Sequence, residues 1–437
     1  MKIPIAPPGN SINQALAAVC SWLAGVMVAS SVQAATPEMV ALGEYLAKVA
    51  DCVSCHTAGP GRAPFAGGLA INSPVGIIYS TNITPDPDTG IGQYSYDDFS
   101  RAVREGIAKD GRRLYPAMPY ASFAAVSDSD IQALYAYFMN GVKAVKQTPP
   151  QTKLPFPFNQ RWVFKFWNAV FANQKTYQPR TDHGAQWNRG AYLVQGLGHC
   201  GACHTPRGLA FQEKGYSELS PDYLSGAVID NWFAANLTGT DASGLGRWSE
   251  TEISTFLETG HGGHGSSVAF GSMVAVIENS TQHLHKADLD AIAHYLKSLS
   301  VKKNVKTTYK PIMQDQFIQT ATAASGFERP GAGLYSGFCA KCHRDNGTGK
   351  PPHIPQLGGN SMVLSENASS LVRLVIEGGK APLTRDGPKP KKMPSFAKKF
   401  SDREIADVVT FVRNSWGNTA TPVTPRDVAL LRTILQK

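Results

Sequence analysis

Three copies of the motif Cys-x-x-Cys-His stand out in the sequence: 52-CVSCH-56, 200-CGACH-204 and 339-CAKCH-343. The chain has seven cysteines, and Cys20 alone lies outside these motifs. A chain of this composition would contain roughly 0.003 such motifs by chance, so their threefold occurrence requires a chemical reason.

The spacing is that of covalent haem attachment. Two cysteines separated by two residues lie on one helical turn and can form thioethers with both vinyl groups of a c-type haem, while the adjacent histidine reaches the iron. We therefore predict three covalently bound haem c groups. The predicted attachment residues are Cys52, Cys55, Cys200, Cys203, Cys339 and Cys342, and the predicted axial histidines are His56, His204 and His343.

Other uses of paired cysteines fit this pattern less well. A disulfide across two intervening residues is strained and stabilises little. A zinc site combines two cysteine pairs that lie close together, whereas these pairs are well over a hundred residues apart. Redox dithiols of the thioredoxin type follow a strand–helix–strand pattern and do not recur three times.

A methionine follows each motif at a similar relative place: Met118 in 115-YPAMPY-120, Met273 in 270-FGSMVAV-276 and Met393 in 391-KKMPSF-396. Each is expected on a loop, opposite the motif histidine. Prolines beside Met118 and Met393 stiffen the loop and would fix the soft thioether against the iron. We predict these three methionines as the second axial ligands of the iron atoms.

Three histidines are alternative axial ligands, and four other methionines are expected to have a packing role. The rival ligands are His261 and His264 in the second unit and His353 in the third. The methionines predicted to fill the core instead are Met39, Met139, Met313 and Met362. With both axial positions of each iron filled, no catalytic residue is expected in this chain.

Helical patterns recur around the motifs. A helix with Gly and Tyr near its start is expected ahead of each motif, at 43–52, 190–200 and 333–339. Two further helices follow in each unit, at 94–106 and 127–141, at 248–260 and 287–299, and at 367–379 and 401–414. The expected helix starts are Ser95 with Asp98, Ser249 with Glu252, and Asn367, and the expected stops are Gly106 and Gly260.

The fold class that follows is mainly α and loop-rich, with three tandem class I cytochrome c-like domains, each built around a covalent haem. Polar stretches rich in Pro or Lys set the boundaries. The expected organisation is a signal peptide at 1–34, domains at 35–145, 181–300 and 326–417, linkers at 146–180 and 301–325, and a C-terminal tail at 418–437 expected to form an amphipathic helix.

The net charge of +9 suggests an acidic protein surface or an anionic lipid as partner. No basic stripe interleaved with aromatic residues indicates nucleic acid. The segments 161–171 and 425–437 could lie in a bilayer interface or pack against another part of a complex. A group of lysines around Met393 could dock a partner or simply be solvated: Lys380, Lys389, Lys391, Lys392, Lys398 and Lys399.

Three short motifs are open to a structural or a ligand-binding interpretation. 82-NIT-84 and 236-NLT-238 recur at equivalent places, and we favour a turn over a role in binding haem propionates. For 86-DPDTG-90 a turn is likewise favoured over a calcium site.

The three motifs, with 78-IYSTNITPDPDTGIGQYSYDDF-99, 111-GRRLYPAMPYASF-123 and 196-GLGHCGACHTPRG-208, make the chain resemble the triheme cytochrome c subunit of bacterial membrane-bound dehydrogenases that act on gluconate, sorbitol, fructose, aldehydes or alcohols. The resemblance covers almost the entire mature chain. It implies a catalytic dehydrogenase subunit with a flavin or quinone cofactor as partner, a small third subunit in some complexes, and electron transfer to ubiquinone. It also implies a place on the periplasmic face of the inner membrane, as a peripheral protein.

The residues are also compatible with two other functions. A free periplasmic electron shuttle would have no fixed partner. A cytochrome c peroxidase would need one haem with an open distal position, so loss of Met273 ligation would favour it.

Overall fold

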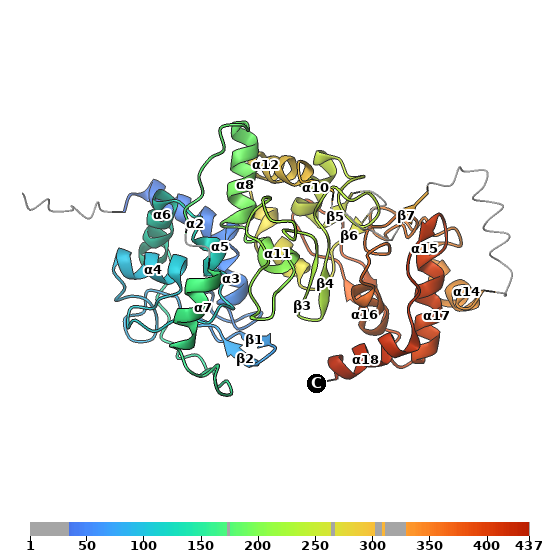
Figure 1. Cartoon of the computed structure of the whole chain (residues 1–437), viewed down its shortest axis with the longest axis horizontal. Helices are drawn as coiled ribbons and strands as arrows, with labels where there is room; N and C mark the ends of the chain where they lie inside the picture. Colours follow the sequence, from blue (N-terminus) through green and yellow to red (C-terminus); the bar gives the residue numbers. More distant parts are fainter. Residues whose placement is uncertain (1–34, 173–174, 264–266, 302–307, 311–328, 437) are drawn as a thin grey trace, which may run out of the picture. The chain divides into compact units, whose positions relative to one another are not determined.

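The computed structural model describes residues 35–172, 175–263, 267–301, 308–310 and 329–436. The predicted signal peptide, His264, Met313 and most of the predicted linker 301–325 lie outside the described residues. We refer below to segment 1 (37–145), segment 2 (181–300) and segment 3 (329–417). The chain in these segments is rich in helices and loops, as the sequence predicts (Figure 1).

Segment 1 holds five helices and one hairpin, and a further helix follows it. These are α2 (Pro37–Val49), α3 (Cys52–Cys55), β1 (Ala70–Ser73), β2 (Gly76–Tyr79), α4 (Tyr96–Glu105), α5 (Tyr120–Phe123), α6 (Asp128–Asn140) and then α7 (Val163–Phe171). The region predicted as the linker 146–180 therefore contains a helix, and α7 packs one of its faces on segment 1 through the buried Phe164.

Segment 2 repeats this order with an additional hairpin and a 3-10 turn. Its elements are α8 (Ala185–Gln195), α9 (Gly201–His204), β3 (Ala227–Ile229), β4 (Trp232–Ala234), α10 (Glu250–Thr259), β5 (His261–Gly262), β6 (Ser267–Val268), α11 (Met273–Asn279), the 3-10 turn η1 (Thr281–His283) and α12 (Lys286–Lys297).

Segment 3 begins with shorter helical pieces. Its elements are α14 (Ala332–Leu334), the π-helical turn η2 (Tyr335–Cys339), α15 (Ala340–His343), α16 (Ser369–Glu377), β8 (Gly379–Lys380), β9 (Lys392–Met393) and α17 (Asp402–Arg413), followed by α18 (Pro425–Leu435). β7 (Thr308–Tyr309) pairs with β10 (Asn418–Thr419). Every described hairpin is a two-stranded antiparallel ribbon.

The helix ahead of each motif packs on the last helix of its segment: α2 on α6, α8 on α12, and α14 on α17. Glycine permits the close crossing in the first two pairs. A Cβ at Gly43 would lie 1.9 Å from the carbonyl oxygen of Ala133, and one at Gly190 would lie 2.0 Å from that of Ala291. The recurring glycine in the sequence thus has a packing role.

Most predicted helix ends are confirmed. Capping boxes join Ser95 to Asp98 and Ser249 to Glu252. Gly106 and Gly260 end their helices with φ values of 64° and 72°, which a residue with a Cβ adopts only with strain. The cap predicted at Asn367 is wrong by one position. The N-cap of α16 is Ala368, and Asn367 instead accepts a hydrogen bond from the backbone N–H of Ser369 (2.9 Å), because its short side chain reaches two residues ahead.

The buried side chains form two main cores. One core joins α2 and α6 of segment 1 with α8 and α12 of segment 2, and it includes Leu46, Ile131, Leu193 and Leu289. The other lies within segment 3 and includes Ile405. Segments 1 and 2 therefore share a core that segment 3 does not enter.

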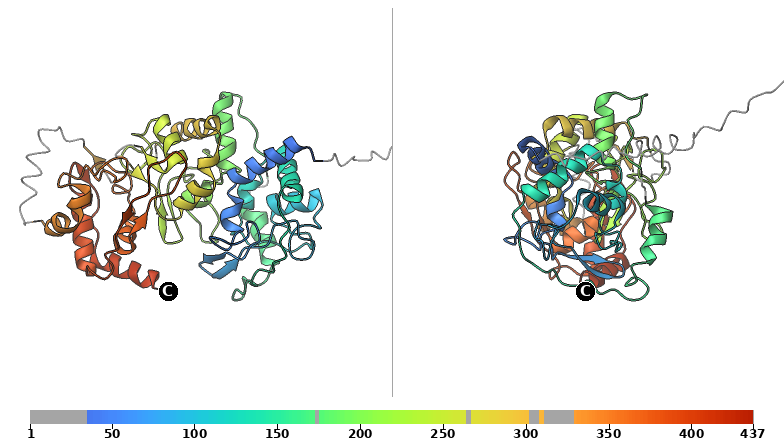
Figure 2. Two further views of the ribbon diagram at one scale, coloured as in Figure 1. Left: turned by 180° about the vertical axis from the view of Figure 1, so that it is seen from behind. Right: turned by 90° about the vertical axis from the view of Figure 1, so that its left-hand side faces the viewer.

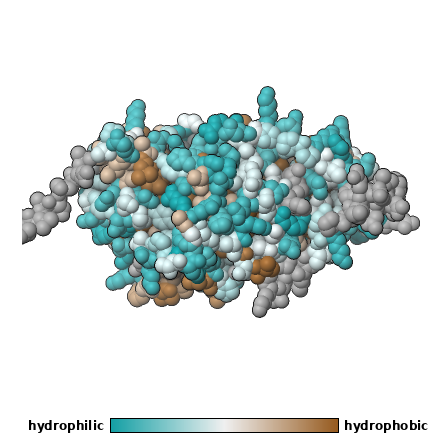
Figure 3. Space-filling model, turned by 90° about the horizontal axis from the view of Figure 1, so that it is seen from above, coloured by the Kyte–Doolittle hydropathy of each residue, from teal (hydrophilic) through white to brown (hydrophobic). Residues whose placement is uncertain are grey.

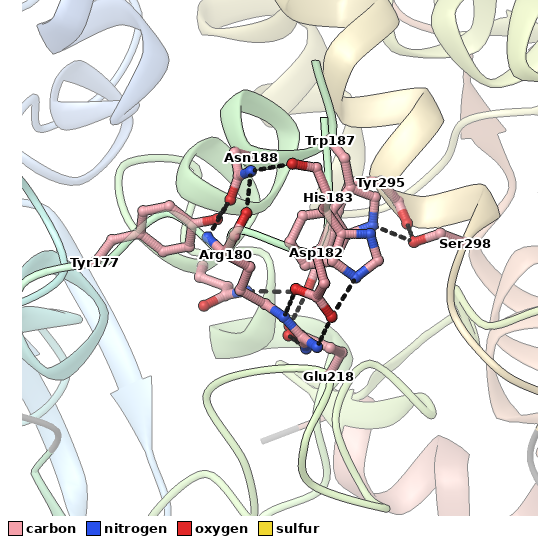
Figure 4. A network of polar contacts seen from close by, with 10 residues as sticks. Tyr177, Arg180, Asp182, His183, Trp187, Asn188, Glu218, Tyr295 and Ser298 are labelled. Atoms are coloured by element: carbon pink, nitrogen blue, oxygen red, sulfur yellow. Dashed lines mark hydrogen bonds and ion pairs between the residues drawn. The ribbon is translucent and has the colours of Figure 1, made fainter. Parts of the chain in front are cut away.

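The end of the predicted linker 146–180 is tied to segment 2 by a polar network (Figure 4). Asn188 on α8 accepts a hydrogen bond from Tyr177 and donates to the backbone carbonyl of Arg180. Arg180 forms ion pairs with Asp182 and with Glu218. Glu218 also accepts a hydrogen bond from Tyr295 of α12 (2.8 Å). The network therefore joins the end of the predicted linker to both α8 and α12.

The C-terminal tail is helical, as predicted. On α18, Val428 and Leu431 are buried in the core of segment 3, and Arg432 forms an ion pair with Asp402 of α17 at 2.6 Å. The apolar face noted in the sequence is therefore used for packing within the chain.

Candidate haem-binding site

The cysteines of each motif are presented by a short helical turn. Cys52 and Cys55 begin and end α3, Cys200 directly precedes α9, and Cys342 lies in α15 just after Cys339. All six thiols are free. Burial raises the pKa of Cys52 and Cys200 to about 12, and that of Cys339 to about 11, so these thiols stay protonated at neutral pH.

Each motif histidine is held by one nitrogen. The Nδ1 atoms of His56, His204 and His343 lie 2.7, 2.6 and 3.2 Å from the backbone carbonyl oxygens of Thr81, Ala235 and Pro355. A carbonyl accepts only from a protonated nitrogen, so Nδ1–H donates and Nε2 keeps its lone pair. Burial lowers the pKa of all three histidines, which favours the neutral form that binds a metal. This is the arrangement that orients an iron ligand from behind.

The first two carbonyls belong to the Asn-x-Thr turns of the sequence. Thr81 and Ala235 directly precede Asn82 and Asn236. The Asn82 Oδ1 atom accepts hydrogen bonds from the backbone N–H (2.9 Å) and hydroxyl (2.8 Å) of Thr84. The same two bonds join Asn236 and Thr238. The turn interpretation is therefore supported, and the turn also places the acceptor for the motif histidine.

Sequence reasoning did not identify these acceptors. Backbone carbonyls carry no residue signature, and the recurring Asn-x-Thr motif was the signal that could have located two of them. In segment 3 the acceptor Pro355 precedes Asn360 by five positions, and no such motif marks it.

The first motif lies against segment 2. Burial, Asp51 and the Cys203 thiol raise the pKa of Cys55 to about 11. The Asn279 side chain donates to the Ser54 hydroxyl at 2.9 Å, which places the end of α11 against the first motif. The ring of His199, next to Cys200, lies 5.4 Å from the ring of Phe123.

The predicted methionine ligands occupy three different local structures. Met118 lies in a turn just before α5 and is partly buried against the core that segments 1 and 2 share. Met393 lies in β9 opposite Gly379, partly buried against the core of segment 3. The expectation of a loop is therefore wrong here, because Met393 pairs with β8. Met273 starts α11, so the expectation of a loop at this position is wrong; the stretch 273–279 contains no Gly or Pro to interrupt a helix.

The rival histidines differ in their surroundings. His261 is buried in β5 with its Nδ1 atom 3.0 Å from the carbonyl oxygen of Thr259, and its Nε2 atom has no partner among the described residues. His353 is partly buried, and its charge contributes to the lowered pKa of His261. Of the methionines predicted to be core, Met39 and Met139 pack against the shared core, and Met362 is partly buried.

Two surface motifs are also resolved. In 86–90 the Asp86 carboxylate accepts hydrogen bonds from the backbone N–H of Thr89 (2.7 Å) and of Asp88 (3.2 Å), so this stretch is a turn, as predicted. The lysines around Met393 are exposed, and Lys399 lies 4.1 Å from the centre of the Phe338 ring, next to Cys339.

The residues present fit a c-type haem. Each motif offers two unpaired thiols one turn apart and a neutral imidazole whose Nε2 is free to bind, and a thioether follows further along the chain. This donor set matches covalent attachment with a histidine and a methionine as iron ligands. Among the described residues, no group of three or more His, Cys, Asp or Glu is arranged to hold a separate metal ion.

Comparison with known proteins supports covalent haem attachment in this chain. The family model for cytochrome c matches residues 329–416. The gluconate 2-dehydrogenase cytochrome c subunit of Pantoea cypripedii is 47% identical over 407 residues, covering 91% of this chain and 90% of the relative. The cytochrome c subunit of the quinone alcohol dehydrogenase of Gluconacetobacter polyoxogenes is 47% identical over 422 residues, covering 95% and 88%.

A more distant relative extends the range of substrates. The fructose dehydrogenase cytochrome subunit of Gluconobacter japonicus is 38% identical over 413 residues, covering 90% of this chain and 82% of the relative. These identities extend over nearly the whole length of each pair of chains. The chain belongs to the family of cytochrome c subunits of dehydrogenases that includes those of gluconate 2-dehydrogenase and quinone alcohol dehydrogenase.

Proposed function

We propose that this chain is the electron-transfer subunit of a dehydrogenase complex and carries three haem c groups, one on each motif. The observation that carries the proposal is the threefold recurrence of a motif histidine whose Nδ1 donates to a backbone carbonyl, beside two free thiols. The haem supplies one-electron redox chemistry when it is bound. The attachment residues would be the six motif cysteines.

The axial ligands in this proposal are His56, His204 and His343 with Met118, Met273 and Met393. A methionine ligand raises the reduction potential relative to a second histidine, which suits transfer toward a quinone. The three units would be tandem cytochrome c domains at 35–145, 181–300 and 326–417. The recurring helix pairs α2–α6, α8–α12 and α14–α17 support this division.

The partner would be a catalytic subunit that oxidises an alcohol, a polyol or a sugar acid with a flavin or quinone cofactor. The relatives are subunits of gluconate 2-dehydrogenase, quinone alcohol dehydrogenase and fructose dehydrogenase, which supports such a partner. The electron acceptor would be ubiquinone. We further propose export by the segment 1–34 and a peripheral place at the periplasmic face of the inner membrane, in a complex that can include a small third subunit. Among the described residues, no helix is long and apolar enough to cross a membrane.

The number of haem groups can be tested by intact mass of the exported protein. Three added haem masses are expected, and each Cys pair changed to Ser should remove one of them. A mass that shows fewer than three haem groups on the unaltered protein would contradict the proposal.

The axial ligands can be tested one at a time. Met118→Leu should abolish the methionine–iron charge-transfer absorbance of one haem in three and lower its potential. Met139→Leu is the matched control, because Met139 packs against the core and is expected to leave the spectrum unchanged. The same comparison with Met273→Leu decides whether the second haem has a methionine ligand or an open position, as the peroxidase alternative requires.

The partner can be tested by purifying this chain from membranes, with no affinity tag on any other subunit. A large flavin or quinone subunit should copurify, and reduction of the haem groups by gluconate, sorbitol or ethanol should require it. Reduction by substrate with this chain alone, or purification as a single soluble chain with full quinone activity, would contradict the proposal.

A further inference from the structure

Helix α7 has one face bound to the chain and one face exposed. Phe164 and Asn168 are buried. The Asn168 side chain accepts a hydrogen bond from the Tyr120 hydroxyl (2.6 Å) and donates one to the backbone carbonyl of Glu105 (3.0 Å). On the other face, Trp162, Phe166 and Val170 are 61%, 64% and 71% exposed. Spaced four residues apart, they form a continuous apolar stripe along the helix.

A neighbouring loop extends this stripe into a patch. The indole Nε1–H of Trp167 donates to the carbonyl of Ala210 at 2.8 Å, which brings a loop of segment 2 beside the helix, and Leu209 and Phe211 on that loop are exposed. We call this surface the α7 patch; it consists of Trp162, Phe166, Val170, Leu209 and Phe211.

The figures place helix α7 at the surface of the molecule. Helix α7 lies at the front of segment 1 in Figure 1, and it stands at the margin of the molecule in the right-hand view of Figure 2. The space-filling view is largely hydrophilic, and brown residues gather along its lower left edge (Figure 3). Exposed apolar side chains gathered in this way mark an interaction surface.

The chain around the patch has a one-sided charge. Residues 131–181 contain no Asp or Glu, and they contain the cations Lys143, Lys146, Lys153, Arg161, Lys165, Lys175 and Arg180. Lys146 and Arg180 form ion pairs with carboxylates from outside this stretch. Lys165 lies on α7 and Lys153 precedes it in the chain; both are exposed and have no ion pair in the part of the chain that the structure describes.

The helix is also held firmly at its base. The guanidinium of Arg161 lies 3.4 Å from the centre of the Tyr115 ring and donates to the carbonyl of Arg113 at 3.0 Å. Because the helix is already ordered, it loses little further conformational entropy when its free face binds a partner.

We propose that the α7 patch is the surface by which this chain lies on an anionic lipid bilayer. Trp and Phe are the side chains that settle at the boundary of headgroups and acyl chains, and adjacent lysines are attracted to anionic headgroups. A helix of nine residues is too short to span the bilayer, so it would lie in the interface plane. The proposal rests on the peripheral membrane place in the proposed function and names its surface. It does not depend on the electron-transfer role, because lipid binding needs neither a redox partner nor a quinone.

The test is cosedimentation of the haem-loaded full chain with vesicles of phosphatidylethanolamine and phosphatidylglycerol. The double variant Trp162→Ser/Phe166→Ser is expected to lower the vesicle partition coefficient by at least about tenfold. Lys153→Gln/Lys165→Gln is expected to lower it by about fivefold for each cation removed, and to weaken its dependence on salt. The lysine variant touches no buried group, so it keeps the proposal testable should the aromatic variant not fold.

Two matched controls distinguish binding through the patch from nonspecific binding to vesicles. Leu430→Ser changes an exposed apolar residue of α18, and Lys391→Gln/Lys392→Gln removes two exposed cations of segment 3. Both are expected to bind vesicles within about twofold of the unaltered chain. Equal losses in the controls and in the patch variants would overturn the proposal. Unchanged vesicle binding by the patch variants, with loss of a copurifying subunit, would overturn it in favour of a protein partner.

Discussion

The junction of segments 1 and 2 differs from that of segments 2 and 3 in what fills it. The first is a continuous apolar core, crossed by the Asp288 network, in which Tyr45 of α2 and Arg189 of α8 both donate to the Asp288 carboxylate of α12 at 2.5 to 2.7 Å. The second joins two separate cores through hydrogen bonds, several of them to backbone atoms, and through a small apolar cluster that includes Ala242, Leu364 and Ala420.

The polar character of the second junction is evident in its contacts. The Ser370 hydroxyl on α16 accepts from the N–H of Phe233 on β4 at 2.7 Å and donates to the carbonyl of the same residue at 3.2 Å. The indole of Trp248 donates to Ser361 at 3.2 Å. Hydrogen bonds of this kind stabilise modestly, whereas a shared apolar core makes two segments unfold together. We therefore expect segments 1 and 2 to behave as one cooperative unit and segment 3 as another.

The largest expected effect comes from cavities in the two cores. Leu193→Ala in the shared core and Ile405→Ala in the core of segment 3 should each lower the free energy of unfolding by about 2–5 kcal/mol, because both side chains are fully buried. Hydrogen exchange on the haem-loaded protein should show Leu193→Ala raising exchange across segments 1 and 2 but not 3. Ile405→Ala should do the reverse, and uniform acceleration everywhere by either variant would remove the distinction.

A second test removes the charge that joins three helices. Asp288→Asn should lower the free energy of unfolding of the coupled segments by about 1–3 kcal/mol, because it leaves the Arg189 guanidinium without its carboxylate. Asp290→Asn on the same helix is the control, since Asp290 pairs with the more exposed Lys286 and should change stability by less than about 1 kcal/mol. Chemical denaturation followed at the haem absorbance measures both, and equal losses would mean that the network does not couple the segments.

The polar junction should respond more weakly. Ser370→Ala removes both hydrogen bonds to Phe233 and should lower the stability of segment 3 by about 0.5–1.5 kcal/mol, without altering exchange in α2 or α6. Ser369→Ala, at the neighbouring position on α16, provides the comparison. A loss above about 3 kcal/mol would show that the second junction is as cooperative as the first.

The smallest effect is expected from pH, because titration removes only the charge-dependent part of the Asp288 network. Burial alone would raise the pKa of Asp288, but hydrogen bonds from Arg189 and Tyr45 and the Arg189 charge outweigh it and lower the pKa. A carboxyl with a lowered pKa in the folded state stabilises above its unfolded pKa of about 3.9, and that contribution is lost as the pH falls through the folded value. Denaturation midpoints of the unaltered chain and Asp288→Asn should therefore converge at acid pH, and a constant difference at every pH would contradict this.

The sequence alone determined the chemistry of the candidate site and much of the helix pattern. The motif spacing predicts covalent haem attachment because two thiols and an imidazole must reach one porphyrin from a single turn. Capping boxes such as Ser95 with Asp98 were predictable for the same local reason, since a helix start is satisfied by residues three positions apart.

The tertiary structure decided what depends on distant residues. It decided that Thr81 and Ala235 supply the carbonyls behind His56 and His204, because a backbone acceptor has no side chain to mark it. It also decided that segments 1 and 2 share one core and that α7 leaves an aromatic face exposed, because burial depends on which surfaces meet. Local spacing specifies what a residue can bind, whereas only packing specifies which neighbour or which solvent it faces.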